Sequence, residues 1–374
     1  MLKIAFVINF SKNSWAGGYF FFDNLISFLI KYKKNVKISV ITDSKKNLKY
    51  LTSKSKVQIL ETNIVSHKIN LKRIIDKVLI IIFGKSFFLE KFLNNNKIDV
   101  LSHHTYCGRK STIRSYPWFP DFQHLRFPKN FSFKNRLFRN INVYLSSKHS
   151  NKIILSSKNV KKDIKKISPE AFRKSYIINH TNKVLSQKKL LSITKLRKKY
   201  NISKKFFLLP NHYWVHKNHL IVLKALNYLS DKNIQVVSTG MLSDHRDRNY
   251  IDKIRNYINF NKLNQNYKIL DLVPFKDLCS LMKNSLAVIN PSFSEGWGNS
   301  ADQARILGKP CILSNIPVHL ELNYKYAYYF NPNDHKELAK LLNFLIKKKL
   351  KISFKDNSFK EKEYINNYLK TILD

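Results

Sequence analysis

Short apolar runs alternate with amphipathic stretches along the whole chain. This alternation is typical of βαβ units that build a mostly parallel sheet. The predicted strands are Lys3–Asn9, Val36–Thr42, Val57–Glu61, Asp99–His103, Lys152–Ser156, Tyr176–Asn179, Phe206–Pro210, Ile234–Thr239, Lys268–Leu272, Leu286–Asn290 and Cys311–Ser314. The predicted helices are Tyr19–Lys31, Phe133–Ser146, His216–Leu229, Asp247–Asn259, Lys276–Lys283, Asn299–Leu307, His335–Lys347 and Ser358–Leu373.

A polar, lysine-rich segment at 183–205 separates two series of such elements. We therefore expect an α/β protein with two doubly wound parallel-sheet domains that face a central cleft, in which two substrates can meet. The first domain spans 1–182 and the second 183–357. The last helix, within 358–374, is expected to pack back on the first domain.

The chain is strongly basic. Its 374 residues include 68 Lys and Arg against 24 Asp and Glu, a formal net charge of +44. Residues 1–182 carry 35 basic and nine acidic side chains, so an anionic partner is expected to face this half. A coding bias toward Lys, Asn, Ile, Phe and Tyr explains the lysines equally well, although it does not explain the scarcity of acids. A membrane, a nucleic acid or an anionic substrate remains open as the partner.

The three cysteines, Cys107, Cys279 and Cys311, have no paired spacing, which fits a reducing compartment and gives no metal-site signature. The first residues form a strand pattern rather than a signal peptide. The longest apolar run, 78–83, falls far short of the ~18 residues that a spanning helix needs. We expect a cytoplasmic protein, either free or peripheral to a membrane.

The segment 291–304 carries the most chemical information. It follows a predicted buried strand, forms a glycine-bearing loop with one carboxylate, Glu295, and then opens a helix. Gly296 and Gly298 let the backbone approach a ligand closely. Free N–H groups at a helix start bind anions, and Glu295 can accept hydrogen bonds from sugar hydroxyls. The alternative is a surface turn with a solvated glutamate.

This segment resembles the donor-sugar loop of glycosyltransferase family 4, and 209–220 resembles the opening of that family's second domain. The resemblance implies the GT-B fold, two Rossmann-like domains around a cleft. It also implies that Lys217 neutralises the donor diphosphate, where the alternative is an exposed helix-start lysine. His212 stands where the family has an arginine, so one fixed positive charge is missing.

By the same resemblance, Glu295 binds donor-sugar hydroxyls and the backbone of Gly296, Trp297, Gly298 and Asn299 lines the sugar and phosphate. Gln303 stands where the family has a second glutamate, which contacts the ribose. The alternative for Gln303 is a capping box with Ser300 at the start of the helix.

Three more segments match the family. Gly17 and Gly18 correspond to its glycine-rich first loop, although helix initiation explains the pair as well. Gly240, after a predicted strand, corresponds to the nucleotide-proximal turn. The phrase 118–128 resembles an acceptor-side stretch, in which Asp121 and His124 would contact an acceptor hydroxyl and His124 would handle its proton. A proline-framed loop with a packed histidine is the alternative.

The resemblance implies a retaining, metal-independent glycosyltransferase with no cofactor beyond its nucleotide-sugar substrate. We expect a glycan or lipid-linked acceptor in surface polysaccharide or lipopolysaccharide synthesis. Basic and aromatic residues within 126–139 suggest contact with an anionic membrane; a solvated basic helix is the alternative. A weakened or non-catalytic sugar-nucleotide binder and a nucleotide-sugar epimerase remain open. Charge alone suggests nucleic-acid binding, for which no module is recognisable.

Overall fold

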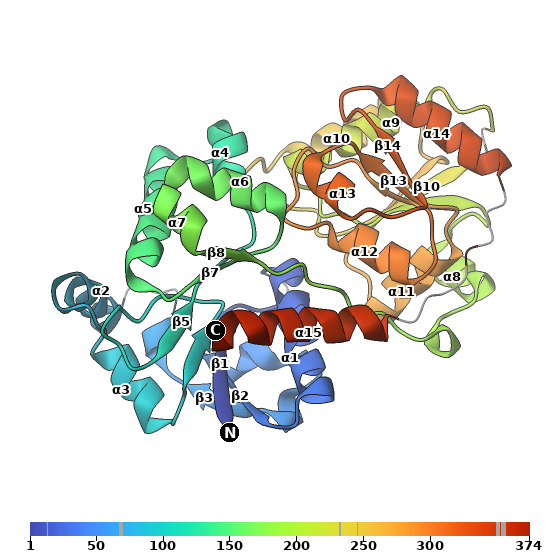
Figure 1. Ribbon diagram of the computed structural model, residues 1–374. Helices are drawn as coiled ribbons and strands as arrows, with labels where there is room; N and C mark the ends of the chain where they lie inside the picture. The colour runs from blue at the N-terminus through green and yellow to red at the C-terminus, as the bar shows by residue number, and fades with distance from the viewer. Residues whose placement is uncertain (13, 67–69, 232, 245, 349–351, 353–356) are drawn as a thin grey trace. The chain divides into compact units, whose positions relative to one another are not determined.

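The computed structural model describes residues 1–12, 14–66, 70–231, 233–244, 246–348, 352 and 357–374. Two compact units share the chain: residues 1–181 together with 358–374, and residues 182–357. The expected domain boundary followed residue 182, and the observed boundary follows 181. Figure 1 shows both units with their elements labelled.

The first unit is built on two parallel sheets. A five-stranded sheet has the order β3-β2-β1-β4-β5, and a three-stranded sheet has the order β6-β7-β8. The strands are β1 Leu2–Val7, β2 Val36–Thr42, β3 Gln58–Glu61, β4 Val100–Ser102, β5 Arg114–Tyr116, β6 Trp118–Phe119, β7 Ile153–Leu155 and β8 Ser175–Ile177. In register, Ile4 of β1 pairs with Ile38 of β2 on one side and with Val100 of β4 on the other.

Helices cover both sheets of this unit. They are α1 Ala16–Tyr32, α2 Leu71–Phe83, α3 Phe88–Asn95, α4 Gln123–Arg126, α5 Phe133–His149, α6 Lys158–Ile167, α7 Pro169–Lys174 and α15 Ser358–Leu373. Short 3₁₀ helices are η1 Lys45–Leu48, η2 Lys54–Lys56, η3 Asn63–Val65 and η4 Pro128–Asn130. The C-terminal helix α15 packs beside α1 in this unit, where Ile365 and Tyr368 share a core with Phe6 of β1. Glu361 of α15 pairs with Lys31 at 2.8 Å.

The second unit is a doubly wound domain around one six-stranded sheet with the order β11-β10-β9-β12-β13-β14, in which the paired strands are parallel. Its strands are β9 Phe206–Leu209, β10 Gln235–Thr239, β11 Tyr267–Leu270, β12 Val288–Asn290, β13 Cys311–Ser314 and β14 Ala327–Phe330. Its helices are η5 Gln187–Lys189, α8 Ile193–Tyr200, η6 Val215–Lys217, α9 His219–Leu226, α10 Tyr250–Phe260, α11 Phe275–Asn284, α12 Asn299–Ile306, α13 Pro317–Glu321 and α14 His335–Lys347.

Both faces of this sheet are covered by apolar cores, which explains why its strands read as continuous apolar runs. Helix α14 buries Leu338, Leu342 and Leu345 in one of these cores. Its start is capped by Asp334, which accepts the Lys336 and Glu337 N–H groups at 2.9 Å. The predicted fold class, α/β with parallel sheets in two GT-B-type domains, is confirmed.

Candidate functional site

The order of the six-stranded sheet locates its ligand edge. Successive crossovers from β9 run one way to β10 and β11, and the chain then returns to add β12, β13 and β14 on the other side. The switch point therefore lies between β9 and β12, and ligands of doubly wound sheets bind at the carboxyl ends of the strands at such a point. Lys217 follows β9 and Glu295 follows β12, so the topology itself brings the two residues together.

Lys217 and Glu295 form an ion pair at this edge. The Lys217 Nζ lies 2.6 Å from Glu295 Oε1, and the two side chains are only 12% and 11% exposed. Burial by itself would raise the pKa of Glu295, but the charge of Lys217 and the hydrogen bonds from Lys217 and Ser292 lower that pKa to about 2. The carboxylate is therefore ionised at neutral pH and faces a cation in a largely water-excluded site.

The loop that carries Lys217 is set by a break in the predicted helix 216–229. The structure has a 3₁₀ turn, η6, then Asn218 in the left-handed region at φ 56°, and only then helix α9. The Asn218 side chain donates to the carbonyls of Pro291 and Pro332, at 3.2 and 2.8 Å. These bonds tie the Lys217 loop to the donor loop, which a continuous helix would not allow.

Asn290, the last residue of β12, organises the polar contacts around the pair. Its Nδ2 donates to Glu295 Oε1 at 3.1 Å and to Ser300 Oγ at 3.0 Å. Its Oδ1 accepts from Asn211 Nδ2 at 3.1 Å. The sequence motifs did not identify this residue. The available signal was an amide at the carboxyl end of a fully buried apolar strand, a position where an unpartnered polar group would be costly.

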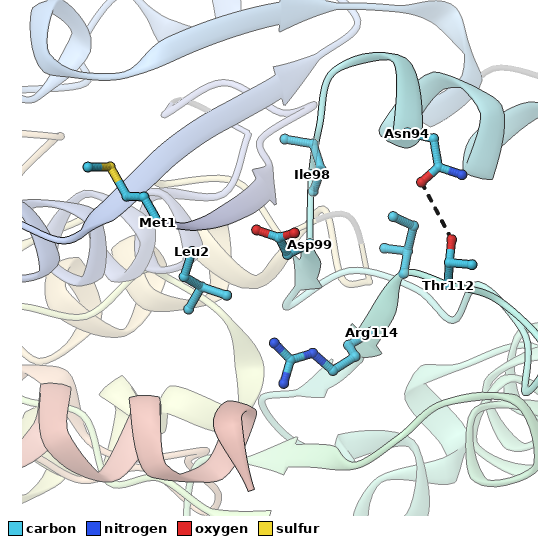
Figure 2. A pocket seen from close by; sticks show the side chains of 8 residues that line it. Met1, Leu2, Asn94, Ile98, Asp99, Thr112 and Arg114 are labelled. Atoms are coloured by element: carbon cyan, nitrogen blue, oxygen red, sulfur yellow. Dashed lines mark hydrogen bonds between the residues drawn. The ribbon is translucent and has the colours of Figure 1, made fainter.

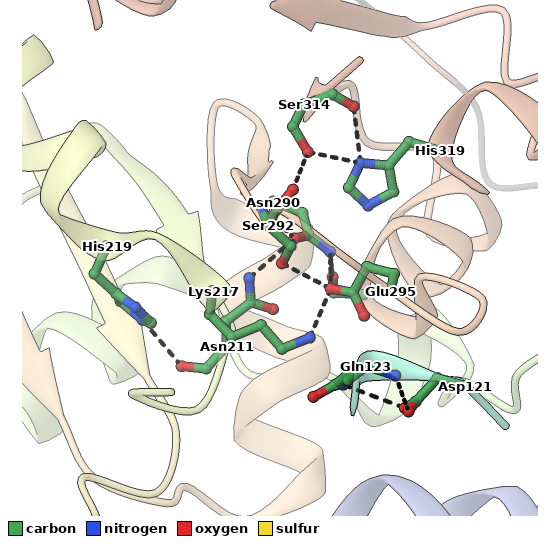
Figure 3. Close-up of polar contacts among 11 residues, drawn as sticks. Asp121, Gln123, Asn211, Lys217, His219, Asn290, Ser292, Glu295, Ser314 and His319 are labelled. Carbon is green, nitrogen blue, oxygen red and sulfur yellow. Dashed lines mark hydrogen bonds and ion pairs between the residues drawn. The ribbon is translucent and has the colours of Figure 1, made fainter. Parts of the chain in front are cut away.

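Figure 3 shows how this network continues from Ser292 to Ser314 and His319. The Ser314 hydroxyl donates to the Ser292 carbonyl at 2.6 Å, so its oxygen accepts from His319 Nδ1 at 3.1 Å. The same Nδ1 donates to the Ser314 carbonyl at 2.9 Å, which fixes the tautomer. Burial lowers the pKa of His319 to about 4, so this imidazole is neutral at physiological pH.

The donor loop ends at a helix start without a side-chain cap. The capping position of α12 is Gly298, at φ +96°, where a side chain would be strained. The alternative role for Gln303, a capping box with Ser300, does not form: Ser300 lies inside the helix and its hydroxyl oxygen accepts from Asn290 instead. The positive end of the helix dipole lies at this helix start, which favours an anion there. Gln303 lies one turn further along and is buried, while Gly296, Trp297 and Asn299 of the loop are partly exposed.

His212, at the position of the family's arginine, does not replace its charge. Burial, with a smaller contribution from Lys217, lowers the pKa of His212 to about 4. Its Nδ1 accepts the Met241 N–H at 2.9 Å, so the ring is held neutral against the β10 loop. Gly240 lies in the same contact: a Cβ there would come within 2.5 Å of the Asn211 carbonyl oxygen. Lys217 is therefore the cation that this loop brings to the site.

In the first unit, Gly17 and Gly18 form the first turn of α1, directly after the β1 loop. A Cβ on Gly18 would lie 2.4 Å from the Trp15 ring, so the indole requires glycine at this position. Trp15 stacks on Trp118 with a centroid distance of 5.9 Å, and Trp118 stacks on Phe21 at 4.1 Å. The carboxyl edge of this sheet is thus lined by aromatic rings.

Asp121 and His124 form hydrogen bonds with different partners. His124 is 1% exposed, and its Nε2 meets Asn140 Oδ1 at 2.9 Å. Burial lowers the pKa of His124. Asp121 is partly exposed and accepts from the backbone and side chain of Gln123. The burial of His124 favours the packing alternative for this residue and leaves Asp121 as the more accessible of the two.

Arg126, which we expected on a membrane-facing surface, is held inside the first unit. Its Nε donates to Asp163 Oδ2 at 2.9 Å and its Nη2 to Asn159 Oδ1 at 2.7 Å.

Among the described residues, no group of three or more His, Cys, Asp and Glu side chains has the arrangement of a metal site.

A hollow of about 570 Å³ lies in the first unit (Figure 2). Its lining includes Leu2, Asp99 and Arg114, which mark the amino ends of β1, β4 and β5. Thr112 and Asn94 share a long hydrogen bond at its rim. Because ligands of such sheets bind at the carboxyl ends of the strands, this hollow is not a candidate substrate site.

Asp302, on α12, connects the site to both ends of the second unit. Its Oδ2 accepts from the backbone N–H and side-chain amide of Asn182, at 2.8 and 3.0 Å. Its Oδ1 accepts from Arg305, whose Nη2 also donates to Asn357 Oδ1 at 3.2 Å. The helix that starts at the donor loop therefore fixes the residues where the chain enters and leaves this domain.

Comparison with known proteins agrees with this arrangement. The family model described as "Glycosyl transferases group 1" matches residues 192–365. The O-antigen chain mannosyltransferase RfbU of Salmonella typhimurium is 26% identical over 318 residues, which span 83% of this chain and 82% of RfbU.

Two solved structures show the same fold. Anabaena HepE, solved in complex with UDP and glucose, is 16% identical and superposes with a TM-score of 0.69 over 99% of this chain and 95% of HepE. The lipopolysaccharide outer core galactosyltransferase WaaB is 15% identical, with a TM-score of 0.63 over 100% and 99% of the two chains.

These findings confirm the resemblance that the motifs indicated, and the matched segment contains Lys217, Asn290 and Glu295. Residues 192–365 belong to the group 1 glycosyltransferases, and the chain is a glycosyltransferase of the GT-B fold.

Proposed function

We propose that this enzyme transfers a sugar, with retained anomeric configuration, from a nucleotide-sugar donor to a hydroxyl of a glycan or lipid-linked acceptor. The observation that carries the proposal is the buried Lys217–Glu295 pair at the switch point of the second sheet. HepE was solved with UDP and glucose and RfbU is a mannosyltransferase, which supports a nucleotide-sugar donor and a hexose. Surface polysaccharide or lipopolysaccharide synthesis is the setting we propose.

The two members of the pair would divide the donor between them. The Lys217 ammonium would meet the diphosphate, assisted by the N–H groups at the start of α12. Among the described residues, the hydrogen bonds to the Glu295 carboxylate come from Lys217, Asn290 and Ser292, and all of them end on Oε1. The other oxygen, Oε2, takes part in none of them, so it can accept from donor-sugar hydroxyls. Gln303 would make a neutral contact to the ribose.

The chemistry then depends on stabilising the leaving group. The bond between the anomeric carbon and the β-phosphate oxygen breaks, and its electron pair stays on the diphosphate, where Lys217 and the helix N–H groups stabilise the charge. The acceptor oxygen bonds to the anomeric carbon on the same face and passes its proton to the departing phosphate oxygen. In this scheme Glu295 orients the sugar and needs no proton of its own, which fits its lowered pKa.

The acceptor would lie on the first unit. Partly exposed Asp121 is the side chain we propose to contact the acceptor hydroxyl, whereas the burial of His124 limits it to positioning this loop. A lipid-linked acceptor would also bring the enzyme to an anionic membrane surface. No metal is assigned a step.

Two measurements test the function. A thermal-shift panel of nucleotide sugars identifies the donor, because a ligand that binds the folded state raises stability by RT ln(1 + [L]/Kd). Incubation of that donor with an acceptor extract should yield a glycosylated product whose proton NMR spectrum shows the donor's anomeric configuration. Inversion would refute the mechanism.

A non-catalytic sugar-nucleotide binder is the second candidate, and the specific observations that favour it are Gln303 and the neutral His212. It predicts donor binding with neither transfer nor slow donor hydrolysis. Hydrolysis above the uncatalysed rate that is lost in Glu295→Gln would exclude this alternative.

A further inference from the structure

Two neighbouring helices of the first unit expose their apolar stripes to solvent instead of burying them. In α2, the residues exposed by about half or more are Leu71, Ile74, Val78, Ile81, Ile82 and Phe83. In α5, they are Phe133, Leu137, Phe138, Ile141 and Tyr144. Apart from Phe83, which ends α2 off this stripe, these positions recur at the three- and four-residue spacing of one helix face. We call this set of eleven side chains the α2–α5 face.

The two stripes belong to one surface. The Lys77 Nζ of α2 lies 5.0 Å from the centre of the Phe138 ring of α5, so the helices are neighbours there. Figure 1 shows α2 and α5 within the same unit. Isolated exposed apolar residues are normal on protein surfaces, but a contiguous set of this size indicates an interaction site.

Core packing does not explain either stripe. Nine of the 13 residues of α2 are Leu, Ile, Val or Phe, yet its buried positions are Asp76 and Ile80. Asp76 holds the helix in place by accepting the N–H groups of Phe87, Phe88 and Leu89 at 2.7–2.8 Å. In α5 the buried positions are Val143, Ser146, Ser147 and His149, so the polar side of the helix faces inward.

The charges around the α2–α5 face select the partner. Segments 71–88 and 128–149 contain nine Lys and Arg residues and a single acid, the buried Asp76. Lys72, Lys85, Lys134 and Arg139 among them are exposed. A protein partner would need a large acidic and apolar surface, whereas an anionic bilayer offers both properties at any point. Cations that flank an apolar helix face are the signature of a helix lying in the membrane interface.

The dimensions fit a helix that lies on the membrane and does not cross it. At ~1.5 Å per residue, the 13 residues of α2 reach about 20 Å, less than the ~30 Å hydrocarbon core. Along the described parts of the chain, no helix combines the length and the apolar character that spanning a bilayer requires.

We propose that the α2–α5 face docks the enzyme on a membrane that contains anionic lipids, with the apolar side chains in the interface and the surrounding Lys and Arg side chains against lipid headgroups. This inference rests on the proposed function in one respect: a lipid-linked acceptor would present its hydroxyl at that surface. The proposal revises our expectation from the sequence, which placed the membrane contact within 126–139. Arg126 is instead paired internally, and α2 provides half of the surface.

Flotation of the full-length enzyme with vesicles tests the proposal. We expect binding to vesicles of phosphatidylcholine and phosphatidylglycerol, and weak binding to phosphatidylcholine alone. The triple variant Ile82→Gln, Phe83→Gln, Phe138→Gln should lower the partition coefficient by about a hundredfold or more, at about fivefold or more per side chain. Phe260→Gln, a single change at an even more exposed phenylalanine of the second unit, is the control and should bind like wild type.

A charge variant, Lys72→Gln, Lys85→Gln, Lys134→Gln, should lose about fivefold in affinity per lysine, and only for anionic vesicles. Lys204→Gln, Lys205→Gln, Lys347→Gln removes the same charge from exposed sites elsewhere. Equal loss in both sets would show that net charge alone drives binding and would overturn the assignment of the face. The assignment would also be overturned if the wild-type enzyme did not bind vesicles. It would be overturned as well if the wild-type enzyme formed a dimer and only the apolar variant were monomeric. A donor thermal shift, measured in each variant, reports the proposed function separately and should be unchanged.

Discussion

The five-stranded sheet of the first unit and the six-stranded sheet of the second unit have the same topology at their switch points but very different side chains there. At the β9–β12 edge of the second sheet, a lysine and a glutamate are paired in a network of amides and hydroxyls. At the β1–β4 edge of the first sheet, His103 contacts Phe21 and Trp118 and is kept neutral, since burial lowers its pKa to about 3. The same topology therefore supplies a charged edge, suited to an anionic ligand, and an aromatic edge, suited to a neutral one.

Loss of the Lys217–Glu295 ion pair should have the largest effect, because this pair distinguishes the charged edge from the aromatic one. Glu295→Gln keeps the shape but removes the charge opposite Lys217, and Lys217→Met removes the cation that stabilises the leaving diphosphate. We expect each to lower kcat by about 10²–10³-fold. Steady-state transfer assays measure this.

The matched control is Lys199→Met, which breaks another lysine–carboxylate pair of the same domain, with Asp277. Transfer by this variant should stay within a few-fold of wild type. If Lys199→Met and Lys217→Met lost activity equally, the Lys217 pair would have only a structural role. Circular dichroism of every variant confirms that it folds.

Acid should destabilise the enzyme through its buried histidines. Burial lowers the pKa of His212 and His319 to about 4 and that of His219 to about 3, against an ordinary value of 6.5. Between pH 6.5 and 4 the unfolded chain therefore binds more protons, and the free energy of unfolding falls as pH falls. Each histidine contributes about 1 kcal/mol per pH unit in that range.

Urea unfolding across this pH range measures the slope, and His319→Gln should reduce it by one histidine's share. The pKa of Glu295, about 2, lies below the ordinary 4.5, so its contribution is present above pH 4.5 and is lost only as pH falls toward 2. Stability that did not change between pH 6.5 and 4 would contradict the burial of these histidines.

Asn290→Ala should have a smaller effect. It leaves Glu295, Ser300 and Asn211 without a shared partner, and we expect a loss of about 1–3 kcal/mol in the free energy of unfolding. Donor affinity should fall as well, because the variant frees the loop that carries Glu295. Asn261→Ala, which removes a surface bond to the Tyr257 carbonyl, serves as the control and should cost far less. Equal costs would indicate that Asn290 does not organise the site.

The smallest effect should come from a substitution at the aromatic β1–β4 edge. The Tyr368 hydroxyl donates to Ser102 Oγ at 2.9 Å, and Ser102 meets His103 Nδ1 at 2.7 Å. Tyr368→Phe should lower the free energy of unfolding by about 1 kcal/mol and leave donor affinity unchanged. A change in donor affinity would show that the two edges are not separate in function.

Much of the fold follows from local pattern. Strands β2 and β13 and helices α14 and α15 have the predicted bounds, because their apolar periodicity is strong and their ends are marked. Strands β5, β6 and β14 were missed. Arg114–Tyr116 and Trp118–Phe119 are two or three residues long and have no apolar run, so only pairing with distant strands makes them strands. Tyr-rich 327–330 is an edge strand that pairs on one side, with β13.

The site was predictable where a motif has a fixed local geometry and not where distant groups meet. The motifs identified Lys217 and Glu295 as candidates. Asn290, Ser292 and His319 were missed, since their importance comes from hydrogen bonds that form only after β12 and β13 are paired. The burial of His124 and the bond from Asn290 to Ser300 were not predicted, because sequence spacing does not reveal which face of a short element is buried.

The decisive question is whether the β9–β12 edge binds the donor diphosphate. The measurement is the thermal shift that the preferred nucleotide sugar produces in wild type, in Lys217→Met and in Lys199→Met. We expect a clear increase in the unfolding temperature of wild type, an equal increase in Lys199→Met, and little or none in Lys217→Met. An undiminished increase in a folded Lys217→Met enzyme would contradict the claim.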